Sequence, residues 1–194
     1  MTTYKAAQFA ERFGKLEIVD KPMPKPGRGE VLVKIEACGV CHSDSLVQYG
    51  ALGNPFPRVP GHEIIGTVYQ VPEQFQKGVR VGSGWNGGYC GSCDQSQRGN
   101  YTNCQKGFAN GISHDGGYQE YALLRQEALC FVPDGMDPTE AAPMLCADRA
   151  QFPRASILEA DLNCLYVEGE QFANPCRDAG YVNTVHGSNY QEPS

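Results

Sequence analysis

Three residues that bind soft metal ions stand far apart in this chain of 194 residues. Cys41 belongs to the run Cys41-His42-Ser43-Asp44, His62 belongs to Gly61-His62-Glu63, and Cys146 lies far downstream. Two thiolates and one imidazole make the three-ligand set of a catalytic zinc, whose fourth position stays open for water or substrate. The types of these residues therefore predict a catalytic zinc centre, provided that the fold brings them together.

The chain has nine cysteines, which is many for a protein with no secretory signal. A disulfide framework is the alternative reading, but the number is odd and residues 1–7 contain no long apolar run. The cysteines also cluster, as Cys38 and Cys41 and as Cys90, Cys93 and Cys104. This clustering favours metal binding over disulfides.

The overall charge excludes some classes of partner. The formal net charge is −6 and the sequence pI is about 5.2, and no block of Lys or Arg stands out. Nucleic-acid binding and anionic-membrane binding therefore have little electrostatic support. No stretch approaches the length of an apolar membrane span. We expect a soluble, cytoplasmic protein.

Short strands separated by glycine and proline must position these ligands. The run 30–37 alternates, with Val31, Val33 and Ile35 on one face, as in a half-buried strand. Other expected strands are 4–9, 16–19, 64–71, 79–81 and 118–124. A helix is expected over 41–49, with Leu46 and Val47 inward, and a second after Asp137, which can cap it. Pro143 can bend that second helix before Cys146. The pattern predicts a mainly β, barrel-like domain with a few short helices.

These motifs together resemble the N-terminal, GroES-like catalytic domain of zinc-dependent alcohol dehydrogenases of the medium-chain dehydrogenase/reductase family. The matching runs are 37–44, 61–63, 107–121 and 138–146, in the order of the family. The resemblance implies a domain over 1–147, a zinc-lobe insertion at about 81–109, and conversion of small alcohols to aldehydes or ketones with NAD or NADP. It also implies zinc as cofactor and leaves a homo-oligomer open.

The resemblance assigns roles to single positions. Cys41, His62 and Cys146 match the catalytic zinc ligands. Glu63 and Asp44 match acidic residues beside the metal, and Ser43 matches the hydroxyl that carries the alcohol's proton away. His42 matches a position that contacts the cofactor pyrophosphate, and Trp85 one that shapes the alcohol pocket. Taken alone, Ser43 could instead cap a helix and Trp85 could belong to the core.

A second metal lobe departs from the family pattern. Cys90, Cys93 and Cys104 match three of the four thiolates of the family's structural zinc, and Ser96 stands at the remaining position. A closed structural site derives its stability from four protein ligands. Two readings follow: weak zinc binding through three thiolates and water, or a lobe without metal. In the first interpretation, Cys90, Cys93 and Cys104 form an incomplete structural zinc site.

A glycine motif in the same region invites another interpretation. Residues 82–87 read G-x-G-x-x-G and follow an expected strand. The residues after the motif, Gly88-Tyr89-Cys90-Gly91, cannot open the helix that would bind a pyrophosphate. We therefore do not expect a dinucleotide site here.

The resemblance stops after about residue 147. Residues 148–194 show no strand–glycine-loop–helix pattern, so we expect an irregular tail and no Rossmann domain. A truncated product, an altered reading frame or a retained intron would explain the break. Two functions stay open: an alcohol dehydrogenase, and a zinc-binding or interaction remnant without turnover. A zinc-free quinone or enoyl reductase is a third possible function, but the complete set of zinc ligands argues against it.

Overall fold

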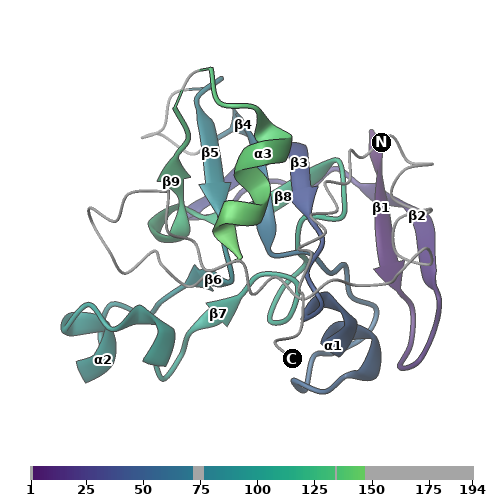
Figure 1. Ribbon diagram of the computed structural model, residues 1–194, viewed down its shortest axis with the longest axis horizontal. Helices are drawn as coiled ribbons and strands as arrows, with labels where there is room; N and C mark the ends of the chain where they lie inside the picture. The colour runs from purple at the N-terminus through teal and green to yellow at the C-terminus, as the bar shows by residue number, and fades with distance from the viewer. Residues whose placement is uncertain (1, 72–76, 134, 147–194) are drawn as a thin grey trace, which may run out of the picture.

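A computed structural model describes residues 2–71, 77–133 and 135–146, and the predicted tail at 148–194 lies outside these residues. Figure 1 shows a central sheet with a strand hairpin on one side and a small lobe on the other. The elements are β1 (Thr3–Phe9), β2 (Leu16–Pro22), β3 (Glu30–Gly39), α1 (Asp44–Tyr49), β4 (Glu63–Gln70), β5 (Arg80–Ser83), β6 (Asn86–Gly88), α2 (Asp94–Gln97), η1 (Tyr101–Asn103), β7 (Phe108–Ala109), β8 (Tyr121–Arg125), η2 (Gln126–Ala128), β9 (Cys130–Phe131), α3 (Pro138–Ala141) and η3 (Ala142–Leu145). The expected mainly β class with a few short helices is confirmed.

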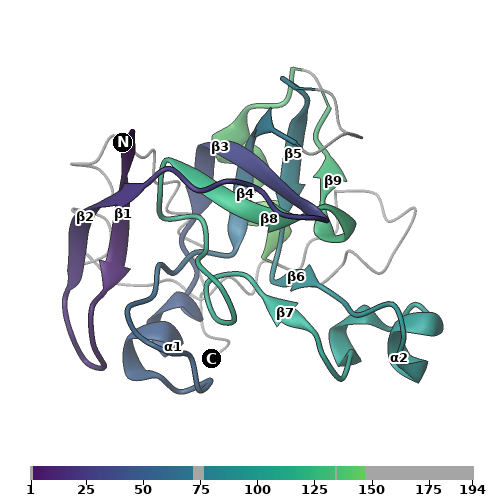
Figure 2. The same cartoon turned by 180° about the vertical axis from the view of Figure 1, so that it is seen from behind.

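The central sheet has five strands in the order β8-β3-β4-β5-β9, and the pairs β1-β2 and β6-β7 form two smaller sheets. Every pairing between these named strands is antiparallel. Figure 2, the view from behind, places the β1-β2 hairpin and the α2 lobe at opposite ends of the molecule, in agreement with Figure 1. None of the helices in the described ranges is long and apolar enough to cross a membrane.

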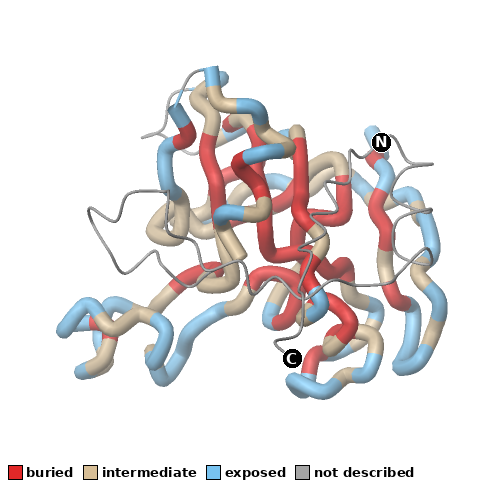
Figure 3. Tube along the Cα trace, in the orientation of Figure 1, coloured by how far each residue is buried: buried red, intermediate tan, exposed pale blue. Residues whose placement is uncertain are grey.

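The core lies along β3 and β4, where the buried colour of Figure 3 is concentrated. Leu32 is as fully buried as Val31 and Val33, so the prediction of a strand with one buried face is wrong for the start of β3. The reason is tertiary, because β8 and β4 flank this strand and α3 and η3 pack against it. Ile35 is only half-buried.

The segment that ends at Cys146 begins at a capped helix. The Asp137 side chain accepts hydrogen bonds from the backbone amides of Thr139 and Glu140, as the sequence predicts. The α-helix stops after one turn and continues as the 3-10 helix η3, which contains Pro143. Ala141 and Ala142 pack against Ile65 in a small apolar cluster. This packing holds the end of η3 over β4 and delivers Cys146 to the strand that follows His62.

The expected strand at 118–124 starts late, at Tyr121. Residues 116–118 instead pair through their backbones with residues 59–61. Gly116 N donates to Val59 O at 2.8 Å, Gly117 N donates to Gly61 O at 2.9 Å, and Tyr118 N donates to Pro60 O at 3.1 Å. The segment before β8 is therefore fastened to the segment that leads into His62.

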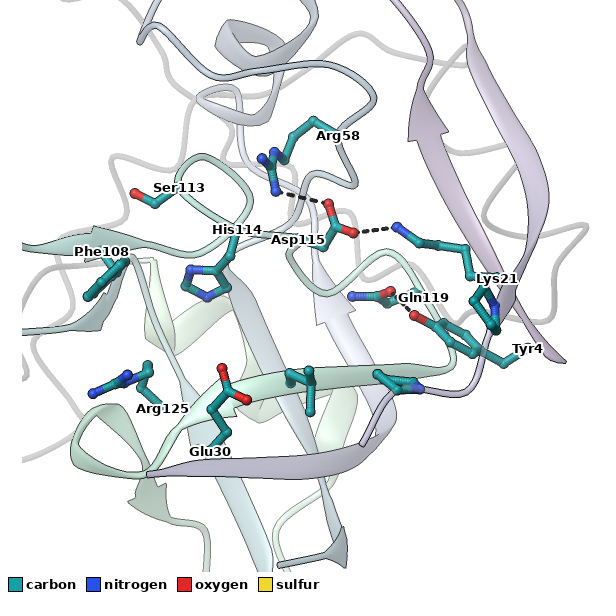
Figure 4. Close-up of a pocket in the computed structure, with 13 residues that line it drawn as sticks. Tyr4, Lys21, Glu30, Arg58, Phe108, Ser113, His114, Asp115, Gln119 and Arg125 are labelled. Carbon is teal, nitrogen blue, oxygen red and sulfur yellow. Dashed lines mark hydrogen bonds and ion pairs between the residues drawn. The ribbon is translucent and has the colours of Figure 1, made fainter. Parts of the chain in front are cut away.

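Asp115 joins the hairpin to this segment (Figure 4). Its carboxylate forms ion pairs with Lys21 of β2 and with Arg58, whose guanidinium lies 3.1 Å away and whose side chain is 11% exposed. The backbone amide of Val59 also donates to Asp115. Asp115 and these two cations line a surface pocket that contains none of the residues of the metal-ligand set.

We expect Asp115→Asn to lower the free energy of unfolding by about 2–4 kcal/mol, because it leaves a buried guanidinium without its carboxylate. Asp20→Asn is the matched control. Asp20 pairs with Lys5 at 2.8 Å, but both side chains are about half exposed, so its loss should cost under about 1 kcal/mol. Urea denaturation followed by circular dichroism measures both variants. Equal losses would show that Asp115 does not fasten the hairpin.

Candidate metal centre

The three predicted ligands come from three separate places in the fold. Cys41 follows β3, His62 directly precedes β4, and Cys146 directly follows η3. The ligand atoms of Cys41, His62, Glu63 and Cys146 all lie within 4.8 Å of one another, and the two sulfurs are 3.4 Å apart. Ligands held about 2.0–2.3 Å from a tetrahedral zinc lie about 3.3–3.8 Å apart, so the two sulfurs already have such a separation. The structure thus brings together the three ligands that the sequence predicts, and it adds the carboxylate of Glu63.

Asp44 sets the direction of the His62 ring. Its Oδ1 lies 2.9 Å from His62 Nδ1 and accepts the backbone amide of Gly61 at 3.1 Å. A ring that donates from Nδ1 to a carboxylate presents its Nε2 lone pair to a metal. Both Asp44 and His62 are 2% exposed, so water does not compete for this bond. Asp44, the first residue of α1, therefore fixes the orientation of the His62 ring just before β4.

The charges in the group fit a divalent cation. The pKa of the Cys41 thiol is lowered to about 4, chiefly because Cys146 donates a hydrogen bond to it, with His62 and Ser43 contributing. The pKa of Cys146 is raised by the same contact. Burial opposes a charge on His62, but Asp44, Cys41 and Glu63 together outweigh burial and raise its pKa. Cys146 thus donates its thiol proton to the Cys41 sulfur, and a metal ion that binds both sulfurs displaces that proton.

The buried carboxylate of Glu63 is a second feature of this group that fits a cation. Its carboxylate is 1% exposed, and its Oε1 has no hydrogen-bond partner among the described residues. Burial raises the pKa of Glu63 to about 8. The carboxylate fits only because residue 39 is glycine, since a Cβ there would lie 1.8 Å from Glu63 Oε2. A buried carboxylate oxygen that accepts no hydrogen bond from the described part of the chain and lies 3.9 Å from His62 Nε2, beside two cysteines, is a place for a cation.

Ser43 points toward the ligands. Its hydroxyl donates to Cys41 Sγ at 3.1 Å and lies 3.5 Å from His62 Nε2. Ser43 is the residue before α1, but its side chain makes no capping hydrogen bond, so the structure does not support the simple capping role. Its neighbour His42 is exposed. The Ser43 hydroxyl thus lies beside two of the three predicted ligands.

Trp85 packs against the metal-ligand group and against the core at once. Its ring lies edge-on to His62 with centroids 5.1 Å apart. It also packs partly against a core cluster that includes Phe9 and Val47. Trp85 is therefore in contact both with a predicted metal ligand and with the core, and its role in shaping an alcohol pocket stays a prediction.

The second cysteine group also assembles. Cys104 Sγ lies 3.5 Å from Cys90 Sγ and 3.8 Å from Cys93 Sγ. Ser96, which is 5% exposed, directs its hydroxyl to the same place, 3.2 Å from Cys93 Sγ and 3.5 Å from Cys90 Sγ. Three thiols and one hydroxyl thus face one another, as the sequence predicts. A neutral hydroxyl is a poor substitute for a fourth thiolate.

The glycine motif at 82–87 is not followed by a helix. Residue 82 lies in β5, residues 86 and 87 lie in β6, and the next α-helix begins at Asp94. Cys38 has a packing role, because its sulfur fills the space beside Gly61 and Gly117. Sequence reasoning missed one residue, Tyr118, whose hydroxyl donates to Asp44 Oδ2 at 2.9 Å. The motif Asp115-Gly116-Gly117-Tyr118 contained that residue, but nothing in its spacing pointed to the metal group.

The model of the family described as alcohol dehydrogenase GroES-like domain matches residues 27–134. Alcohol dehydrogenase patD of Aspergillus clavatus is 46% identical over 149 residues, which are 75% of this chain and 38% of that protein. The chain spans less than half the length of the curated relatives it matches.

Solved structures agree with the sequence comparison. The cobalt- and zinc-bound thermostable alcohol dehydrogenase of Pyrobaculum aerophilum superposes with a TM-score of 0.66 at 32% identity, over 73% of this chain and 44% of that one. The rspB alcohol dehydrogenase of Escherichia coli CFT073, complexed with NADH, gives a TM-score of 0.65 at 29% identity, over 74% of this chain and 42% of that one.

Proposed function

This chain belongs to the zinc-type alcohol dehydrogenases of the medium-chain dehydrogenase/reductase family, as their GroES-like N-terminal domain, and from that premise we propose that it serves the oxidation of small alcohols to aldehydes or ketones with NAD or NADP. One observation carries the proposal. Cys41, His62 and Cys146, from three distant segments, place their ligand atoms within 4.8 Å of one another. Cys41, His62 and Cys146 would hold the zinc, with Glu63 beside them.

Zinc in this group would supply a Lewis acid that makes loss of an alcohol's proton possible near neutral pH. Ser43 is assigned to receive that proton, because its hydroxyl lies beside both Cys41 and His62. The next hydroxyl along the chain is occupied, since Ser45 Oγ donates to the His42 carbonyl at 2.7 Å. The proton therefore leaves Ser43 through water or through hydroxyls of the cofactor.

Two neighbouring side chains are assigned to the other partners of the reaction. His42, which is exposed, is assigned the contact with the pyrophosphate of the nicotinamide cofactor. Trp85, packed edge-on against His62, forms one wall of the alcohol pocket and keeps bulk water from the ring. The cofactor itself supplies the hydride chemistry, and the protein positions the two reactants.

The incomplete lobe of Cys90, Cys93 and Cys104 is assigned a weaker, structural zinc. Backbone amides donate to these sulfurs, as from Cys93 N to Cys90 Sγ at 3.4 Å and from Cys90 N to Cys104 Sγ at 3.3 Å. Such bonds favour the thiolate forms that a metal needs. The assignment rests on three ligands where the family has four.

The activity is tested on the purified chain loaded with one equivalent of zinc. Reduction of NAD and of NADP is followed with a series of primary and secondary alcohols, and binding of NADH and NADPH is titrated by fluorescence. Alcohol-dependent reduction that a chelator abolishes is the expected result. Zinc binding with neither turnover nor cofactor binding would reject the enzyme function for this chain. It would favour the alternative, a zinc-binding module without turnover.

A further inference from the structure

Four hydrogen bonds hold the carboxylate of Asp44. Its Oδ1 accepts from Gly61 N and faces His62 Nδ1, while its Oδ2 accepts from Cys41 N at 3.0 Å and from Tyr118 Oη at 2.9 Å. Three of these partners are metal ligands or their neighbours. The fourth, Tyr118, comes from a segment 74 residues away along the chain. Asp44 is 2% exposed, so these protein groups replace water around it.

Tyr118 is itself held rigidly. The Ala7 amide of β1 donates to its carbonyl at 2.7 Å, and its own amide donates to Pro60 O. Its ring is 2% exposed and rests on Gly61, where a Cβ would lie 2.6 Å from a ring carbon. Gly61 also has φ of +100°, which glycine adopts without strain. The hydroxyl is therefore fixed in space by β1 and by the residues next to His62.

We propose that Tyr118 is a positioning residue for the metal-binding group, acting through Asp44. Its hydroxyl fixes the plane of the carboxylate, and the carboxylate fixes both the tautomer of His62 and the backbone of Cys41. Without the hydroxyl, Oδ2 keeps only the Cys41 amide, and three hydrogen bonds instead of four fix the plane of the carboxylate. The ring of His62 then points its Nε2 less closely toward the sulfurs of Cys41 and Cys146. This inference concerns metal binding and stands whether or not the chain turns over alcohols.

Tyr118→Phe removes the hydroxyl and keeps the ring on Gly61. We expect zinc affinity at the Cys41–His62–Cys146 group to fall by about 10-fold, the low end of the range for groups that support metal ligands. Competition with a chromophoric chelator measures the affinity. The absorption spectrum of the cobalt-loaded protein reports the geometry of the ligands independently of activity, and its ligand-field bands should shift.

Tyr4→Phe is the matched control. Tyr4 is another buried tyrosine of the same core, and its hydroxyl donates to Gln119 Oε1 at 2.9 Å, away from any metal ligand (Figure 4). Both variants lose one buried hydrogen bond, so both should lose similar stability. Only Tyr118→Phe should change the zinc affinity and the cobalt spectrum. Unchanged affinity and spectrum in folded Tyr118→Phe would overturn the proposal, as would an equal change in both variants.

Asp44→Asn supplies a second test that keeps Tyr118 in place. It should weaken zinc binding by at least as much as Tyr118→Phe, because it weakens the acceptor through which Tyr118 acts. The double variant should bind zinc no more weakly than Asp44→Asn alone. Independent, additive losses in the double variant would contradict the route through Asp44. If Tyr118→Phe fails to fold, full zinc affinity in Asp44→Asn would still overturn the proposal.

Discussion

His62→Ala should lower the affinity of the Cys41–His62–Cys146 group for zinc by about 100-fold or more. Binding of about 10–16 kcal/mol shared among four ligands gives roughly 3 kcal/mol for each, and about 1.4 kcal/mol corresponds to a factor of ten. The variant also leaves Asp44, 2% exposed, as a buried charge without its imidazole, so we expect it to lower the free energy of unfolding as well. Chelator competition at constant pH measures the change.

His42→Ala is the control for this variant. His42 lies next to Cys41 in sequence and is also a histidine, but it is exposed and is not among the grouped ligands. The zinc affinity of the His42→Ala chain should stay within a few-fold of the zinc affinity of the parent chain. A loss in His42→Ala equal to that in His62→Ala would mean that the ligand set has been assigned wrongly. Zinc affinity unaffected by His62→Ala would lead to the same conclusion.

Ser96→Cys should convert the second lobe into a tight zinc site. The Ser96 hydroxyl already faces the sulfurs of Cys90 and Cys93, so a thiolate at this position completes a four-sulfur set. A fourth thiolate adds roughly 3 kcal/mol, or about 100-fold in affinity, by the same division among ligands. Zinc retained after dialysis should rise from one to two ions for each chain. Metal analysis and chelator competition measure this change.

Two controls separate the fourth ligand from the mere addition of a thiol. Ser96→Ala removes the hydroxyl and should leave the affinity of the lobe within a few-fold. Ser113→Cys adds a cysteine at an exposed site that lies outside both ligand groups. It should retain no second zinc. If Ser96→Cys retains no more zinc than Ser113→Cys, the hypothesis that the lobe lacks only a fourth ligand to bind zinc tightly is wrong.

Local patterns in the sequence were enough to predict the strands and the candidate ligands. The strand at 30–37 and the cap at Asp137 follow from the types of neighbouring residues, and both appear in the structure, although the expected alternation of buried and exposed residues does not. Residue types and the resemblance to the family also pointed to Cys41, His62 and Cys146 as ligands, and the structure brings them together. Residues close together in the sequence determine these features, so a local pattern is enough to predict them.

Features created by long-range packing could not be predicted in this way. The burial of Leu32 depends on what covers the second face of β3. The hydrogen bond from Tyr118 to Asp44 depends on the pairing of 116–118 with 59–61, which shortens the expected strand. The fit of Glu63 depends on the missing Cβ of Gly39. Each of these joins segments whose contact no local pattern specifies.

The central claim is that Cys41, His62 and Cys146 form one metal site with an open position. It is tested most directly by the cobalt spectrum of a Cys104→Ala chain, in which the second lobe is disabled. The account predicts one cobalt ion, tetrahedral ligand-field bands, a sulfur-to-metal charge-transfer band that Cys146→Ser weakens, and a band shift when imidazole fills the open position. No bound cobalt, or a spectrum unchanged by Cys146→Ser, would contradict it.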